Sequence, residues 1–139
     1  MVFSREAGPL KIATFNINNI NKRLHNLTAW LARAQPDVVC LQELKVEQRA
    51  FPTSALRDLG YRGVWLGERS WTGVAILARE CDPVLTRSKS VVFRQGDAAG
   101  SFPSLSNSVR STRERGVDRW VRGEENASDH APAWIVLDR

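Results

Sequence analysis

Apolar positions divide the first part of the chain into short segments with the spacings of strands and helices. Residues 11–16 are predicted to be a strand. Between residues 22 and 34 the apolar positions recur every three or four residues, which is the spacing of one helix face. Residues 37–42 are a continuous apolar run, typical of a strand buried on both faces. Strand, helix and buried strand together predict a βαβ unit. The apolar helix positions are Leu24, Leu27, Trp30, Leu31 and Ala34.

The pattern of short elements continues to about residue 80. Residues 51–59 carry apolar residues at helical spacing, and Gly60 follows as a helix-ending residue. Residues 61–66 and 73–78 are predicted strands. The connection between them, from Gly67 to Gly73, is typical of a hairpin turn. We therefore expect a second helix and an antiparallel pair of strands after the βαβ unit.

Regular patterning is lost between residues 87 and 116, which are rich in serine and arginine. A short strand is possible at residues 91–93 and part of another element at 105–109, but most of the segment is predicted to be loop or disorder. Order is expected to return near Val117, and residues 133–137 form a final predicted strand. The chain then divides into a tail, an ordered N-terminal part, a low-order connection and a C-terminal strand segment. Their ranges are 1–10, 11–86, 87–116 and 117–139.

The composition describes a globular chain of ordinary size. Its 139 residues fit one domain, and 42% hydrophobic with 25% charged residues argue against a disordered or fibrous protein. No apolar run is long enough to cross a bilayer, and the N-terminus lacks the apolar core of a signal peptide. We expect a cytoplasmic protein without a membrane partner. Cys40 and Cys81 have no metal-binding spacing and fit a reducing compartment, and Cys40 is expected to be a buried small hydrophobic residue.

The charge balance is basic, with 20 lysines and arginines against 15 acidic residues, a net charge of +5. Such a surface favours a polyanionic partner such as nucleic acid. The excess is modest, so an arginine-rich composition without any anionic partner explains it equally well.

Polar residues end the first two predicted strands. Asn16 ends the first strand, and Gln42 and Glu43 end the second. Because the carboxyl ends of parallel strands lie at one edge of a sheet, these side chains can face the same cavity. A carboxylate there suits Mg²⁺, which binds one or two carboxylates together with waters and phosphate oxygens. The alternative is that Glu43 lies in the first turn of the next helix, where an acidic residue is favourable without any function.

A second group of polar residues, from Ser128 to Pro132, precedes the last predicted strand. The adjacent Asp129 and His130 act together only if a turn points both into one cleft, and Pro132 stiffens that turn. An imidazole beside a carboxylate can move protons or orient a nucleophile. The alternative is an ordinary turn led by Asp129 that carries a surface histidine.

Among the five tryptophans, one is a candidate for contact with nucleic acid. Trp71 lies in the predicted turn beside Arg69, so an aromatic ring that can stack on a base adjoins a cation that can bind phosphate. Core packing explains aromatic residues more often and is the alternative.

These motifs, taken in order, resemble a known family. Residues 11–18 read Lys-Ile-Ala-Thr-Phe-Asn-Ile-Asn, and residues 35–45 end in Leu-Gln-Glu-Leu-Lys. Gly73-Val-Ala-Ile-Leu77 follows, and Ser128-Asp-His-Ala-Pro132 comes near the C-terminus. The combination resembles the exonuclease III and AP endonuclease group of the endonuclease/exonuclease/phosphatase superfamily. The similarity covers residues 11–86 and 117–139.

The resemblance implies a chemistry and a set of site residues. Members are DNA phosphodiesterases of base-excision repair that depend on a divalent metal, Mg²⁺ or Mn²⁺, and act as 3′–5′ exonucleases or AP endonucleases. By resemblance, Asn16, Glu43, Asp129 and His130 would bind the metal. Asp129 and His130 would also be catalytic, with Asp129 orienting His130 toward the scissile phosphate or the attacking water. The implied partner is DNA with abasic sites or duplex ends.

The resemblance also implies an α/β fold, here an incomplete two-sheet α/β sandwich of the endonuclease/exonuclease/phosphatase type. The middle of the family domain is missing, and with it the Gly-Asp-x-Asn motif whose aspartate would activate the water; Asp97 lies in Gly-Asp-Ala-Ala instead. Three readings follow: an active DNA phosphodiesterase, a catalytically inactive truncated relative that at most binds nucleic acid weakly, or an enzyme of the superfamily that acts on another phosphoester. The basic charge and the nuclease motifs disfavour the third. Loss of the middle would expose an apolar sheet face, through which the chain could self-associate.

Overall fold

The computed structural model describes residues 8–68, 70, 72–85, 91–94 and 111–138. Most strands belong to one mixed sheet of six, in the order β3-β4-β2-β1-β8-β7. A separate pair, β5 and β6, forms a two-stranded antiparallel sheet. The strands are β1 (Leu10–Asn16), β2 (Val38–Gln42), β3 (Tyr61–Leu66), β4 (Val74–Arg79), β5 (Asp82–Leu85), β6 (Val91–Arg94), β7 (Ser111–Val117) and β8 (Ala133–Asp138).

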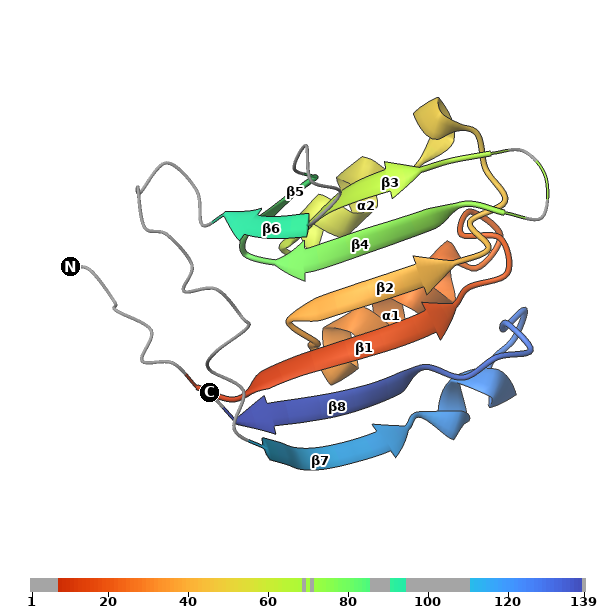
Figure 1. The fold of residues 1–139 in the computed structure, drawn as a ribbon. Coiled ribbons are helices and arrows are strands. Elements are labelled where there is room, and N and C mark those ends of the chain that lie inside the picture. Colours follow the sequence, from red (N-terminus) through yellow and green to blue (C-terminus); the bar gives the residue numbers. More distant parts are fainter. Residues whose placement is uncertain (1–7, 69, 71, 86–90, 95–110, 139) are drawn as a thin grey trace.

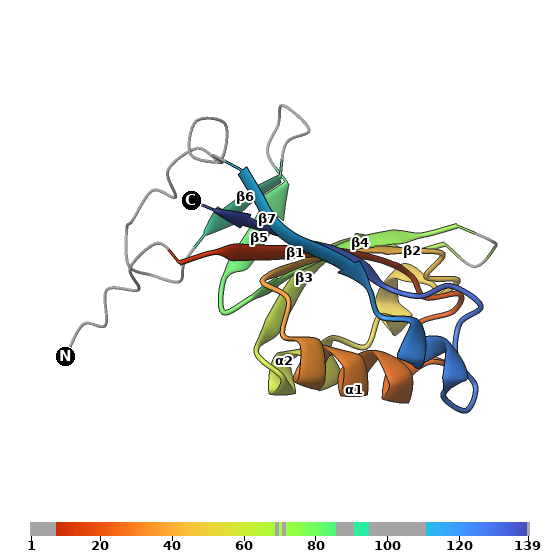
Figure 2. The same ribbon diagram turned by 90° about the horizontal axis from the view of Figure 1, so that it is seen from below.

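Both α-helices cover the same face of the six-stranded sheet (Figure 2). They are α1 (Leu24–Ala34) and α2 (Thr53–Asp58), and two short 3-10 helices, η1 (Gln48–Ala50) and η3 (Arg119–Gly123), lie in the connections. The β5–β6 pair lies at one end of the sheet, on the side away from the helices (Figure 2). Among the described residues, no helix is long and apolar enough to span a membrane.

The predicted βαβ unit is confirmed, because β1 and β2 pair in parallel with α1 between them in the chain. The predicted hairpin is confirmed as well, since β3 and β4 are antiparallel neighbours. The last strand, β8, pairs antiparallel with β1, so that Ile12 lies beside Ile135. Residues from the two ends of the chain therefore meet in the middle of the sheet (Figure 1).

The core lies between the sheet and the helices. Alternate strand residues point to this side and are buried, among them Phe15 and Leu77. Trp30 of α1 is fully buried, and its ring meets Phe15 edge to face at 5.4 Å between centroids. These contacts fix α1 against β1 and so fix the position at which β1 ends.

Three expectations from the sequence need correction. The first concerns β7, which begins at Ser111, six residues before Val117, because its backbone pairs with β8 although its sequence is polar. The second is that β2 is buried on the helix side only, with every second residue partly exposed. The third follows from this: Cys40, expected to be buried, lies on the partly exposed side, and Cys81 is the buried cysteine. In the described residues no layer covers the far side of β2.

Asp118 joins the C-terminal segment to the N-terminal helix. Its carboxylate accepts hydrogen bonds from the indole Nε1 of Trp30 at 2.8 Å and from that of Trp134 at 3.1 Å. Its main-chain N–H donates to the carbonyl of Pro132 at 2.9 Å. Since Trp30 lies on α1 and Trp134 on β8, one carboxylate connects three separate parts of the chain.

We predict that Asp118→Ala destabilises the protein by about 2–4 kcal/mol, because it leaves two indole N–H groups without their acceptor, one of them on the fully buried Trp30. Asp118→Asn keeps an acceptor oxygen and should lose less. Urea denaturation followed by tryptophan fluorescence measures both. The control is Asp58→Ala at an exposed position, expected to change stability by no more than about 0.5 kcal/mol. Equal effects of Asp118→Ala and the control would contradict this role.

Candidate functional site

The segment after β2 places Glu43 at the edge of the sheet, beside the end of β1. Glu43 and Lys45 both have φ near 52°, a left-handed conformation that is uncommon for such residues. Leu44 between them is fully buried, and its main-chain N–H donates to the carbonyl of Gly73. Gly73 has φ 105° and lies so close that a Cβ there would meet that of Leu44 at 2.9 Å. Burial of Leu44 thus turns the two charged side chains outward on either side of it.

The start of the loop after β1 supplies two amides to the same edge. The side chain of Asn16 lies close enough to the carboxylate of Glu43 to lower its pKa, while its Oδ1 accepts the main-chain N–H of Asn18 at 3.2 Å. Asn18 has φ 48°, accepts the Lys45 ammonium at Oδ1, and donates from Nδ2 to Asp129 at 3.4 Å. Asn18 therefore connects the segment after β2 with the segment before β8.

Ser128 fixes the segment before β8 to the end of β1. The Ser128 hydroxyl is buried; it donates to the main-chain carbonyl of Asn16 at 2.7 Å and accepts the main-chain N–H of His130 at 3.2 Å. Next to it, the Nδ1 of His130 lies 3.0 Å from Asp129 Oδ1. The imidazole and the carboxylate are both more than half exposed, at 53% and 72% of their side-chain surfaces. They form an oriented pair that is open to a large ligand.

Both carboxylates at the edge are held in their charged form. Hydrogen bonds from Asn16 and then Lys45 lower the pKa of Glu43, and the charges of Lys45 and His130 add to this. For Asp129, desolvation is the largest single effect and raises the pKa. The hydrogen bond and charge of His130, a backbone hydrogen bond and the Asn18 amide together outweigh it and lower the pKa below its ordinary value.

The structure therefore brings Asn16, Glu43, Asp129 and His130 to one edge of the sheet, where β1 and β2 end and the chain enters β8 (Figure 1). We call these four residues, together with Asn18, Lys45 and Ser128, the edge site. Glu43 does not lie in a helix, since the next helical segment begins at Gln48. The sequence did not single out Asn18, Lys45 or Ser128 as candidate site residues. Asn18 and Lys45 each stand two positions from a residue that was chosen, and that spacing was the available signal.

The donor set agrees with a hard divalent cation. Glu43, Asn16 and Asp129 offer carboxylate and amide oxygens, the ligands that Mg²⁺ and Mn²⁺ prefer. In the described part of the chain no three His, Cys, Asp or Glu side chains cluster closely enough to enclose a metal. The Lys45 ammonium lies 3.2 Å from Glu43 and provides a positive charge at the same place. The residues suit a metal that is completed by waters and by a ligand's oxygens.

Trp71 and Arg69, the predicted nucleic-acid contacts, lie outside the described residues. Their neighbour Thr72 accepts the main-chain N–H of Lys45 at 3.0 Å, so the end of this turn adjoins the edge site. The other four tryptophans have structural partners. Trp30 packs on Phe15, Trp65 stacks on Phe51, Lys11 lies over Trp134 and Arg33 lies over Trp120.

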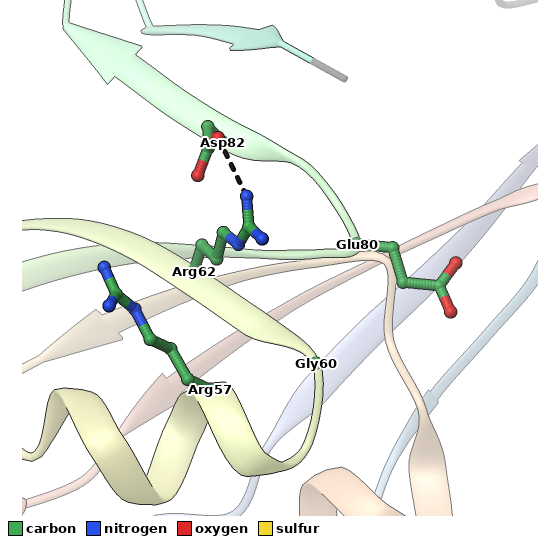
Figure 3. A pocket seen from close by; sticks show the side chains of 5 residues that line it. All are labelled: Arg57, Gly60, Arg62, Glu80 and Asp82. Carbon is green, nitrogen blue, oxygen red and sulfur yellow. Dashed lines mark hydrogen bonds and ion pairs between the residues drawn. The ribbon is translucent and has the colours of Figure 1, made fainter. Parts of the chain in front are cut away.

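A pocket of about 670 Å³ lies at the opposite end of the sheet, where β3 begins and β4 ends (Figure 3). Arg62 on its wall is paired with Asp82 at 3.0 Å. Its remaining lining residues are Arg57, Gly60 and Glu80. The pocket shares no residue with the edge site, so the oriented acid–imidazole pair and this pocket are separate features.

The mixed sheet, covered by helices on one face, defines an α/β protein. Acidic, amide and imidazole side chains gather where β1 and β2 end, and such groups suit anions and hard cations. Residues 13–136 match the Endonuclease/Exonuclease/phosphatase family, and the chain belongs to that family. The incomplete α/β sandwich expected from the sequence is confirmed by this match and by the single large sheet.

Individual relatives are similar over part of the chain. Exodeoxyribonuclease III of Haemophilus influenzae is 40% identical over 78 residues, which cover 56% of this chain and 29% of the relative. A 3′–5′ exonuclease of Neisseria meningitidis is 43% identical with a TM-score of 0.51, covering 53% of this chain and 28% of the relative. An AP endonuclease of Archaeoglobus fulgidus is 37% identical with a TM-score of 0.52, covering 63% and 37%. The chain thus spans well under half the length of these relatives.

We predict that Lys45→Met raises the pKa of Glu43, because the ammonium no longer donates a hydrogen bond to the carboxylate or stabilises its charge. A carboxyl-detected ¹³C NMR titration measures this directly. The carboxylate is charged above its lowered pKa, so in the wild type the interaction with Lys45 is lost only as pH falls through that value, and in the variant the carboxyl should titrate at a higher pH. Arg49→Met is the matched control, since Arg49 pairs with Glu47 at the same 3.2 Å. A Glu43 titration unchanged by Lys45→Met would contradict the assignment.

Proposed function

We propose that the edge site binds a phosphodiester group of DNA and that the protein is a divalent-metal-dependent DNA phosphodiesterase of the exodeoxyribonuclease III type. The observation that supports this most is that Glu43 lies near Asp129 and His130. Asp129 is 86 positions after Glu43 in the sequence. The relatives with similar sequences are named for exonuclease and AP endonuclease activity. A basic chain with a net charge of +5 fits a DNA partner.

Each residue of the edge site has a role in this proposal. Asp129 accepts from Nδ1 of His130, which fixes the ring and leaves Nε2 to contact a phosphate oxygen or the attacking water. Lys45 supplies a positive charge for the phosphate, and the amides of Asn16 and Asn18 hold the charged groups in place. Ser128 keeps the Asp129–His130 segment at the end of β1.

Glu43 is the residue that would hold a divalent cation, with the amide oxygen of Asn16 and the carboxylate of Asp129 beside it. A bound Mg²⁺ or Mn²⁺ would stabilise the negative charge that builds up on a phosphate during hydrolysis. In the turn before β4, Trp71 and Arg69 are proposed to contact the DNA strand, because the end of that turn adjoins Lys45. The proposed location is the cytoplasm, which agrees with two cysteines that form no disulfide.

We predict cleavage of a duplex that carries one abasic site, and shortening of a duplex from its 3′ ends, with Mg²⁺ or Mn²⁺ and not with EDTA. Glu43→Gln and His130→Gln should each reduce the rate by about 10²-fold or more, as expected for removal of a charge-stabilising or proton-transferring group. Glu47→Gln is the matched control, since its carboxylate pairs with Arg49 outside the site. Gel electrophoresis of labelled strands measures all three. Cleavage that survives both site substitutions would refute the assignment of the site.

A second candidate is a DNA-binding protein that does not cleave. It is favoured by one observation: the sequence contains no Gly-Asp-x-Asn, the family motif whose aspartate would activate the water. Loss of a general base costs about 10²–10⁴-fold in rate. The edge site would then bind phosphate through Lys45 and His130 without hydrolysis.

This second candidate predicts binding without cleavage. With two phosphate contacts, affinity for a short duplex should fall about tenfold between 50 and 200 mM salt, because bound cations are released from the DNA. Lys45→Met should weaken binding and flatten the salt dependence, whereas Lys22→Met on the exposed surface should change it little. Fluorescence anisotropy measures the affinity. An affinity that is independent of salt would exclude phosphate binding at the edge site.

A further inference from the structure

Within the part of the chain that the structure describes, only the β5–β6 pair lies on the side of the six-stranded sheet away from the helices, at one end (Figure 2). The cross-strand registers put alternate residues of all six strands on this side, and we call it the open face. All four of the large hydrophobic residues that are exposed among the described residues lie on it. They are Leu66 at 61%, Val74 at 53%, Val117 at 51% and Ile135 at 37% exposure.

The sequence of the central strands is suited to burial on both sides. In β2, Val38 and Cys40 point to the open face and Val39 and Leu41 to the core, so the strand is apolar on both sides. In β4, Ile76 lies beside Cys40 on the open face. A face that contacts only water has no reason to be apolar along its centre, so this composition indicates a covering layer.

The polar residues of the open face lie around its border, at the strand ends and on the outer strand β7, where Arg115 lies beside Ile135. Where the strands β1 and β2 end, Gln42 donates a hydrogen bond to Thr14 at 2.9 Å. At the opposite end, Arg62 is paired with Asp82 at 3.0 Å. An apolar centre with a satisfied polar rim is the usual composition of a protein–protein interface.

The area of the open face matches a small specific interface. Six strands of about six residues span roughly 30 Å by 20 Å at ordinary strand spacing and rise. The whole face is then about 600 Å², so a symmetric pair would bury at most about 1,200 Å², and less where β5 and β6 occupy one end, which places the contact among small, weak interfaces. The matched region is only 29% of the Haemophilus relative and 28% of the Neisseria relative, and the described part of this chain has only the β5–β6 pair on this side.

Association through the sheet edges is less favourable than association through the face. The outer strand β7 carries Arg113, Glu114 and Arg115 in succession and has an irregular register between Thr112 and Glu114, both of which discourage pairing with another strand. On the other side of the sheet the outer strand is β3, and β5 packs against it. The surface best suited to a second molecule is therefore the open face.

We propose that two copies of this chain pair through their open faces, each sheet covering the other, to form a symmetric two-sheet sandwich with the helices outside. Two twisted sheets pack face to face at about 10 Å, with apolar side chains interdigitating between them. The small area makes this a reversible dimer with a dissociation constant on the order of 1–100 µM. Pairing does not depend on whether the edge site cleaves DNA.

The test is sedimentation equilibrium of the full chain from about 1 to about 200 µM, a range that brackets the expected dissociation constant. The wild type should pass from monomer to dimer and reach a plateau at the dimer mass. Val74→Glu and Ile135→Glu each place a charge on the open face at an already exposed position, so the monomer should stay folded and the dimer should be lost. Ala29→Glu, at an exposed position on α1, is the matched control and should dimerise like the wild type.

A second measurement uses the unmodified protein. Cys40 lies in the middle of β2 on the open face, so alkylation of its thiol, followed by mass spectrometry, should slow as protein concentration rises. A monomer with a reactive Cys40 at every concentration would overturn the proposal. A monomer with a protected Cys40 would also overturn the proposal, because the chain's own residues would then cover the open face. A sedimentation mass that keeps rising without a plateau would overturn it in favour of open-ended association.

Discussion

The attachment of the C-terminal segment to the N-terminal helix and strand is the constraint on which this structure depends. Asp118 accepts hydrogen bonds from Trp30 and Trp134, and β8 pairs along β1. Without this attachment the sheet would lose β8 and β7, and Asp129 and His130 would have no fixed position. Ser128 then sets the final orientation, because its buried hydroxyl bonds at once to the end of β1 and to the backbone of His130. The same contacts between the C-terminal segment and the N-terminal helix and strand thus determine both the stability and the geometry of the site.

The edge site is organised mainly by interactions within itself. Glu43 is stabilised by Asn16 and Lys45, and Asp129 by His130 and Asn18, so both carboxylates remain charged. Backbone conformations with positive φ at Asn18, Glu43 and Lys45 add strain, which persists where buried neighbours such as Leu44 leave no alternative. Strained residues and perturbed carboxylates gathered in one place are a common feature of functional sites.

The sheet has a different environment on each side. Its helix side has a packed core around Phe15, Trp30 and Leu77, whereas its other side carries apolar side chains that the described chain leaves partly exposed. This asymmetry agrees with the composition of β2, which is apolar on both sides. It also explains why Cys40 differs from the expected buried residue. The strand sequences correspond to a two-layer arrangement of which the described residues build one layer.

The sequence alone determined the local elements and the family. The helical spacing around Trp30, the continuous apolar run at residues 37–42 and the polar residues at Asn16 and Glu43 placed β1, α1, β2 and the strand ends nearly where they lie. These features depend on neighbours a few residues apart, which a sequence displays directly. Only the tertiary structure decided that polar residues 111–117 form β7, because pairing with β8 supplies the hydrogen bonds that composition does not suggest. It likewise showed that Asn18 contacts Asp129 and that Ser128 contacts Asn16, because these partners lie in distant segments and spacing along the chain indicates only neighbours such as Lys45 and Glu43.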